Sequence, residues 1–129
     1  MNQSVNQGES EKIEGLAQVF KGLADKTRLH MLLLLLEHGE LCVCDFVGVL
    51  RITQSKASRH LRYLYHSGLV EDRREGQWTH YRLAAAMDPR TRLVVEALAN
   101  GLGEDDRAQL KQELAEWLER KGETLPPGP

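Results

Sequence analysis

Cys42 and Cys44 are the only cysteines of the 129-residue chain, and a single residue separates them. Thiolate sulfur is a soft ligand that selects soft, thiophilic species. About ten residues later comes a polar and basic segment, residues 54–61, which is typical of a helix that reads DNA. A soft-ligand pair so close to a DNA-reading element indicates a switch, in which binding at sulfur releases DNA.

The spacing of the two cysteines restricts how they bind a single atom. On an ideal α-helix, residues two apart lie about 200° apart around the axis. Two sulfurs that share one atom must come within about 4 Å, taking zinc–thiolate bonds of about 2.3 Å as a guide. Cys42 and Cys44 therefore chelate only if the helix unwinds at its start, or if the turn there is already irregular. The alternative is that both are small apolar side chains of the core.

The redox state and the third ligand complete this hypothesis. A disulfide between cysteines this close would add little stability, so we expect free thiols in a reducing cytoplasm. Trivalent arsenic or antimony prefers three ligands, and the third is a hydroxide, an external thiol or an atom that the ligand brings; a methylated trivalent arsenical needs only two sulfurs. No pair among the five histidines has strong metal-ligand spacing, and His38, four residues before Cys42, is the nearest candidate.

Hydrophobic periodicity places these residues on a predicted framework. Apolar residues at helical spacing, with capping and breaking residues at the ends, predict helices at 9–22, 26–38, 41–50, 54–66, 89–101 and 104–121. Alternating residues around Glu75-Gly76 predict a hairpin of strands 69–74 and 77–83. This order predicts a winged helix-turn-helix, mainly α with a β-hairpin wing (an α+β fold).

The domain organisation follows from the same pattern. The length and the 41% of hydrophobic residues indicate one domain with a real core. We expect a disordered N-terminus at 1–8, the winged domain at 9–103, an additional C-terminal helix at 104–121 and a flexible tail at 122–129. The polar residues 1–10 resemble no secretory signal, and the apolar run at 31–36 is too short to cross a bilayer.

Charge is unevenly distributed along the chain, although the net charge is only −2. Residues 51–92 carry nine basic and four acidic side chains, whereas acidic residues outnumber basic ones on both sides of this stretch. A basic centre between acidic ends is the pattern of a DNA-reading face, and a solvated mixed surface is the alternative.

The predicted DNA contacts come from the helix at 54–66 and from the wing. The start of a recognition helix reaches base edges, while residues a turn later meet the backbone and wing residues meet phosphates or the minor groove. The helix supplies Gln54, Ser55, Lys56, Ser58, Arg59, His60 and Arg62; the wing supplies Arg73, Arg74 and Gln77. His60 either packs or touches phosphate, and a solvated helix face is the alternative for the set.

Five segments together resemble a known family over roughly residues 12–100: residues 20–29, 40–45, 54–61, 67–70 and 76–83. The chain resembles the arsenic-responsive repressor (ArsR/SmtB) family of bacterial metal sensors, and the Cys-Val-Cys-Asp segment is similar to the arsenic-type sensor site. The resemblance implies a homodimer formed by the first and last core helices, in which the inducer-free form represses.

The sequence also departs from the family's patterns. The best-known arsenic sensors carry a third cysteine three residues after the second, where this chain has Val47. The zinc and nickel members place Asp and His ligands on the final dimer helix, whereas residues 93–100 contain no histidine. The N-terminal cysteines of lead and cadmium members are absent as well. A site of two thiolates remains.

These observations predict a cytoplasmic homodimeric repressor of double-stranded operator DNA, with no membrane partner and no cofactor needed for DNA binding. The expected inducer is As(III), Sb(III) or a methylated trivalent arsenical at Cys42 and Cys44. A repressor that senses thiol oxidation or persulfides is the alternative. A small thiol oxidoreductase is disfavoured, because no base, oxyanion donor or cofactor loop accompanies the thiols, and we expect no enzyme activity.

Overall fold

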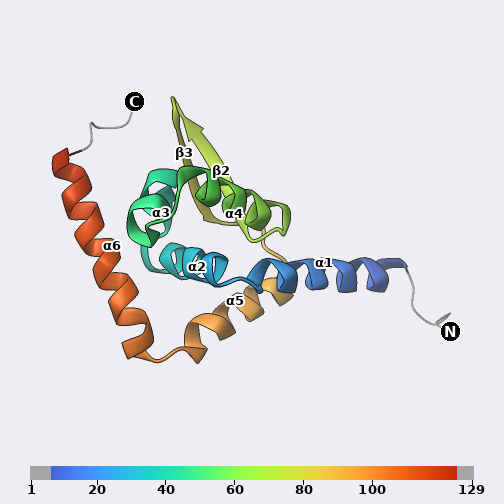
Figure 1. Ribbon diagram of the computed structural model, residues 1–129. Helices are drawn as coiled ribbons and strands as arrows, with labels where there is room; N and C mark the ends of the chain where they lie inside the picture. Colours follow the sequence, from blue (N-terminus) through green and yellow to red (C-terminus); the bar gives the residue numbers. More distant parts are fainter. Residues whose placement is uncertain (1–6, 125–129) are drawn as a thin grey trace.

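The computed structural model describes residues 7–124, and Figure 1 shows their arrangement. The elements are α1 (Gln7–Leu23), α2 (Lys26–His38), β1 (Glu40–Cys42), α3 (Val43–Leu50), α4 (Gln54–His66), β2 (Val70–Glu75), β3 (Trp78–Leu83), α5 (Pro89–Gly101) and α6 (Glu104–Thr124). Two predicted boundaries are wrong, because α1 already includes Gln7 and Gly8 and α6 continues past Lys121 to Thr124. The rest of both predicted terminal segments lies outside the described residues.

Helix α2 forms the centre of the core, as its leucine run predicts. Residues 31–35 are all buried, so this helix is covered on every side over more than a turn. Asp25 caps its start by accepting the backbone N–H of Arg28, and Gly39 ends it with a φ of 94°, which favours glycine.

Helices α3 and α4 form the helix-turn-helix. Their fully buried Phe46, Leu61 and Leu64 belong to the same core cluster as α2. The turn between them is short because Arg51 adopts a left-handed conformation, with φ 57° and ψ 47°, and Thr53 caps α4 by accepting the N–H of Lys56. This geometry fixes the start of α4 relative to α3.

Leu41 and Cys42 were predicted in the third helix, and the structure corrects this. They lie in a short strand, β1, that pairs antiparallel with β3 and makes a three-stranded sheet in the order β1-β3-β2. Pairing with β3, where Leu41 lies opposite Tyr81 and Cys42 opposite His80, outweighs the local helical pattern. The helix therefore begins at Val43, and Cys42 lies at the junction of strand and helix.

The wing is the β2–β3 hairpin, paired from Val70 with Leu83 to Glu75 with Trp78. The expected turn at Glu75-Gly76 is shifted by one residue, because Glu75 still belongs to the ladder and the connection is Gly76-Gln77. Since β3 also pairs with β1, one strand joins the wing to the segment that carries Cys42.

Helices α5 and α6 complete the chain. Asp88 caps α5 and Pro89 occupies its first turn, as predicted. Figure 1 shows α6 running alongside α2 and α3. Near its start, Arg107 and Lys111 lie 3.5 and 3.4 Å from the carboxylate of Glu37 on α2. Within residues 7–124, no helix is both long and apolar enough to cross a membrane.

Candidate thiol site and nucleic-acid interface

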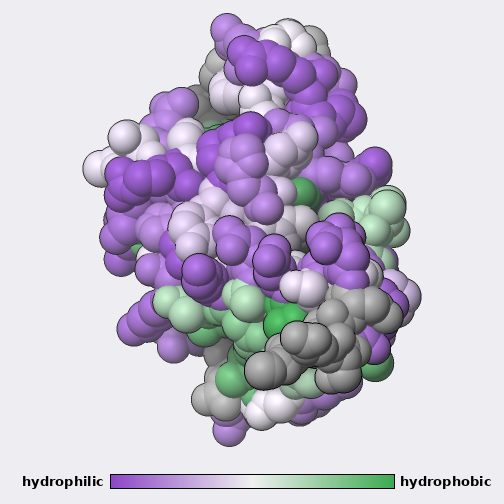
Figure 2. All heavy atoms as spheres, turned by 90° about the vertical axis from the view of Figure 1, so that its right-hand side faces the viewer, coloured by the Kyte–Doolittle hydropathy of each residue, from purple (hydrophilic) through white to green (hydrophobic). Residues whose placement is uncertain are grey.

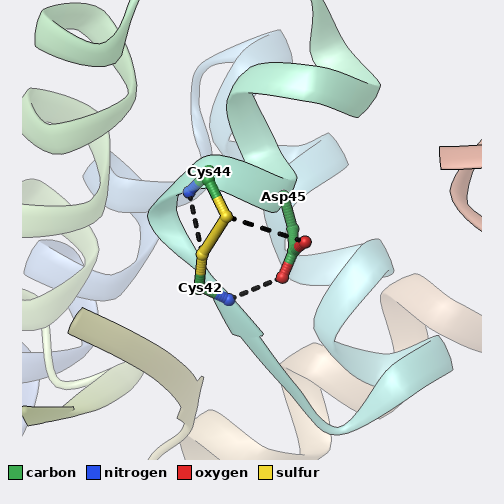
Figure 3. A group of neighbouring side chains, drawn as sticks. All are labelled: Cys42, Cys44 and Asp45. Atoms are coloured by element: carbon green, nitrogen blue, oxygen red, sulfur yellow. Dashed lines mark hydrogen bonds between the residues drawn. A yellow bond between two sulfur atoms is a disulfide. The ribbon is translucent and has the colours of Figure 1, made fainter. Parts of the chain in front are cut away.

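The two cysteines lie side by side at the start of α3 (Figure 3). Cys42 is the N-cap residue, with the extended backbone angles φ −86° and ψ 162°, so it lies outside the helical spiral. Its Sγ accepts the backbone N–H of Cys44 at 3.1 Å. Chelation requires either unwinding of the helix start or a turn that is already irregular. The second alternative is present here, without any unwinding of α3.

The expectation of free thiols is wrong for this structure. A disulfide joins Cys42 and Cys44, whose Cα atoms are 5.3 Å apart. Its physical origin is the N-cap conformation of Cys42, which turns the first sulfur toward the second. Cys42 is buried and Cys44 is half-buried, so the pair is reached from the side of Cys44.

Asp45 is a third member of the site, a role that its place in the Cys-Val-Cys-Asp segment does not by itself predict. Its Oδ2 accepts the backbone N–H of Cys42 at 2.8 Å and completes a capping box. Its Oδ1 lies 4.0 Å from the Sγ of Cys44. Among the described residues, one group of side chains has the spacing of a metal site, and it consists of Cys42, Cys44 and Asp45 without any histidine.

Helix α6 reaches the same carboxylate. Trp117 Nε1 and Lys121 Nζ both donate to Asp45 Oδ1, at 2.9 and 2.7 Å. The indole of Trp117 lies directly over Gly48, where an added Cβ would come within 2.5 Å of the ring. The separation of more than 70 residues leaves no local signal for these contacts. The spacing of Trp117 and Lys121, which places them on one face of α6, is the only sequence feature that points to a shared partner.

The start of α4 presents most of the predicted DNA-reading side chains to solvent. Gln54, Ser55, Lys56 and Arg59 are exposed, Ser58 is half-buried, and the buried Ala57 and Leu61 face the core. Arg62, one turn later, is exposed and lies 3.2 Å from Asp72 of the wing.

His60 faces inward and is buried, unlike the exposed candidates for DNA contact on α4. Its Nδ1 lies 3.1 Å from a guanidinium nitrogen of Arg28 and 3.9 Å from the carboxylate of Asp25. Burial, opposed by the charge of Asp25, lowers the pKa of His60, so the neutral imidazole is favoured. Of the two roles that the sequence leaves open, packing is the one that this geometry favours.

The three predicted wing residues differ in their surroundings. Arg73 donates to the carboxylate of Glu40 at 2.6 Å and to Glu75 at 3.3 Å, and this hydrogen bond to Arg73 lowers the pKa of Glu40. Arg74 and Gln77 are exposed, with Gln77 in the turn of the hairpin. The wing therefore offers Arg74 and Gln77 to a partner, while Arg73 is held by β1.

Comparison with known proteins places this geometry in a family. Residues 25–72 match the family described as "Bacterial regulatory protein, arsR family". The "Arsenic resistance transcriptional regulator ArsR1" of Pseudomonas putida is 43% identical over 105 residues, which cover 79% of each chain. The chain belongs to the arsR family. The "Arsenical resistance operon repressor" of Escherichia coli (strain K12) is 58% identical over 67 residues, and this chain spans 57% of that relative's length.

A solved structure described as that of a possible ArsR-family transcriptional regulator shares the fold. The homodimeric winged helix-turn-helix DNA-binding domain of Mb0332 from Mycobacterium bovis has a TM-score of 0.63 and 32% identity, covering 78% of this chain and 91% of that one. The predicted fold and family are thereby confirmed. Membership places the protein among DNA-binding transcriptional regulators rather than enzymes.

Proposed function

We propose that this arsR-family protein is a homodimeric repressor that leaves its operator when a trivalent arsenical or antimonial binds the reduced Cys42–Cys44 pair. The observation that carries the proposal is the close approach of the two sulfurs at the start of α3, the helix that packs on the recognition helix α4. The names of the relatives from Pseudomonas putida and Escherichia coli support an arsenical as the inducer. A repressor that acts on operator DNA works in the cytoplasm, and the proposal includes this location.

The surface of α1 and α5 supports the dimer. Large apolar side chains lie open to solvent here: Ile13, Phe20 and Leu93 are 63%, 52% and 67% exposed. Figure 2 shows hydrophobic side chains gathered in the lower part of the displayed face. Large exposed apolar side chains gathered on one face are typical of an interface. A two-fold dimer would present two α4 helices to half-sites about 34–36 Å apart, one turn of DNA.

The chemistry of induction requires the thiol form. A cellular dithiol supplies two electrons and two protons and converts the disulfide into two thiols. Each thiol then exchanges its S–H bond for an S–As bond while one As–O bond breaks and water leaves; arsenic stays trivalent. Two sulfurs that bridge one atom stand about 4 Å apart, by analogy with zinc thiolates, so the metalloid fixes two otherwise independent thiol side chains at one distance and orientation.

This constraint on the two side chains is the proposed switch. Cys42 is buried at the end of β1, whereas Cys44 and Asp45 lie in the first turn of α3, so this turn is the part of the site that adjusts to the bound metalloid. Helix α3 packs on α4, and β1 pairs with the wing strand β3, so both DNA-binding elements adjoin the site. A coupling free energy of about 1–3 kcal/mol between inducer and DNA is typical of such systems.

The proposal is tested by titrating the reduced dimer on operator DNA with arsenite, antimonite and a methylated trivalent arsenical. We expect release together with an adduct of one metalloid per chain, measured by intact mass. Metalloid binding without release of DNA would contradict the proposed switch. Absence of metalloid binding would contradict the proposed identity of the inducer.

Sensing of thiol oxidation or persulfides is the second candidate function, and the disulfide in the structure favours it. In this case peroxide or a persulfide, rather than a metalloid, releases the DNA. Peroxide oxidises the dithiol to the disulfide and is reduced to water. Release by peroxide with no response to any of the three metalloids would establish this candidate over the first.

The two DNA-binding elements are expected to differ in what they read. Arg59→Ala should weaken operator binding by about 1–3 kcal/mol and relax specificity at one base position, because Arg59 projects from the exposed start of α4. Arg74→Ala should weaken binding to all sequences and lower its salt dependence, because a wing arginine meets phosphate. Fluorescence anisotropy with operator and scrambled duplexes at several salt concentrations measures both. Specificity lost in Arg74→Ala but kept in Arg59→Ala would reverse the two roles.

A further inference from the structure

Helix α6, which contacts Asp45 at the thiol site, lies outside residues 25–72, the segment that matches the family description. Asp45 is the one carboxylate in the group with Cys42 and Cys44, and its Oδ1 lies 4.0 Å from the Sγ of Cys44. Among the described residues, this carboxylate is the protein group placed to fill the third position of a trivalent metalloid.

The hydrogen bonds of Asp45 oppose that role. An oxygen of an ionised carboxylate accepts about two hydrogen bonds. Both places on Oδ1, the oxygen near Cys44, are taken by Trp117 Nε1 and Lys121 Nζ of α6, and Oδ2 accepts the backbone N–H of Cys42. The carboxylate is buried, and its bonds to the ammonium and the indole are charge-assisted. Coordination through Oδ1 would require these bonds to break.

The docking of α6 is also sterically fixed. Gly48 lies one turn after Asp45 on α3, and the indole of Trp117 fills the space that any side chain there would need. At the other end of α6, Arg107 and Lys111 lie beside Glu37. Trp117 and Lys121 are therefore held against Asp45 by packing on Gly48 and by the contacts at the other end of α6. Their position does not depend on a single exposed ion pair.

We propose that Trp117 and Lys121 are specificity-determining residues of the thiol site. By occupying Asp45 Oδ1, they keep the third position of a bound metalloid free of protein ligands, which favours an inducer that brings its own third substituent. A methylated trivalent arsenical is such an inducer: it loses two hydroxyls as water, forms two S–As bonds and keeps its As–C bond. Arsenite loses two hydroxyls in the same way and keeps the third as a weak oxygen ligand. This inference rests on the proposed function.

Removing a hydrogen-bond donor from Asp45 Oδ1 should change the ratio of the affinities for the two arsenicals. In Trp117→Phe and Lys121→Met, Oδ1 regains a place for coordination. On arsenite the carboxylate can replace the remaining hydroxyl, which takes up a proton and leaves as water. We expect arsenite to bind about tenfold more tightly, the equivalent of about 1.4 kcal/mol, and the methylated arsenical to change by less than about twofold.

The measurement is direct arsenical binding to the free, reduced protein, followed by the absorbance of the sulfur–arsenic bond. A phosphine reductant is used and removed, because a thiol reductant would itself supply the third ligand. The matched control is Lys111→Met, which removes a lysine of the same helix that faces Glu37 instead of the site. Thermal unfolding of every variant shows that it is folded at the temperature of the titration.

Adding Asp45→Asn to Lys121→Met tests whether the gain in arsenite affinity comes from the carboxylate. The neutral amide is a poor ligand for arsenic, so the double variant should lose this gain. Equal changes for the two arsenicals, or a gain that survives Asp45→Asn, would overturn the inference. So would a loss of arsenite affinity in Asp45→Asn alone, since Asp45 would then already be a ligand. If the wild-type protein binds neither arsenical, the proposed function itself fails, an outcome distinct from binding with an unchanged ratio.

Discussion

Cys44→Ser should abolish release of the operator by arsenicals while leaving repression intact. One thiolate cannot chelate, so the affinity for a trivalent arsenical should fall by about a hundredfold or more, which is about 2.7 kcal/mol. Cys44 lies in the first turn of α3, whereas the exposed basic residues lie at the start of α4 and on the wing. DNA affinity should therefore change little. Anisotropy of labelled operator, with and without inducer, measures both quantities.

Cys42→Ser provides a parallel variant that keeps the helix cap. The Sγ of Cys42 accepts the N–H of Cys44, and a serine hydroxyl is a better N-cap acceptor than a thiol. The two serine variants should therefore fold and both fail to respond. His38→Ala is the matched control, because His38 is an exposed residue near the site that donates no ligand to it. If either serine variant releases operator DNA at the inducer concentration that releases the wild type, chelation by the two cysteines is not the mechanism.

The fold could be predicted almost completely from local patterns. The leucine run of α2, the caps Asp25, Thr53 and Asp88, and the alternation in the wing each specify an element through contacts within a few residues. The prediction fails at Leu41 and Cys42, where the stabilising partners are Tyr81 and His80 of a strand some 40 residues later. A helical pattern ahead of a helix carries no information about such pairing.

The site was predicted only in part, for a similar reason. The two cysteines and the exposed start of α4 could be predicted from the sequence, because soft ligands and basic helix faces are defined by residue type. The inward rotation of His60 depends on Arg28, and the role of Asp45 depends on Trp117 and Lys121. The closeness of the sulfurs depends on the N-cap angles of Cys42. All three come from backbone geometry or tertiary contact, which residue types do not encode.

Asp45→Ala should lower the free energy of unfolding by about 2–4 kcal/mol. The carboxylate is 2% exposed and accepts hydrogen bonds from a backbone N–H, an indole and an ammonium. Loss of an N-terminal capping interaction costs about 1 kcal/mol, and hydrogen bonds to a charged group contribute about 1.5–3 kcal/mol each. These contributions share one acceptor and overlap, so their sum is an upper limit. Denaturant unfolding of the reduced protein measures the change.

Lys121→Met separates the contribution of the ammonium from that of the carboxylate. The side chain of Lys121 is 32% exposed, so solvent screens its ion pair and the loss should stay near 1 kcal/mol or below. Asp45→Ala should cost more because it leaves the N–H of Cys42 and the indole of Trp117 without their acceptor. Equal losses in the two variants would mean that Asp45 stabilises α6 docking alone. A larger loss of unfolding free energy in Asp45→Ala would show that the carboxylate stabilises both the start of α3 and the docking of α6. The same side chain then stabilises the fold and borders the thiol pair.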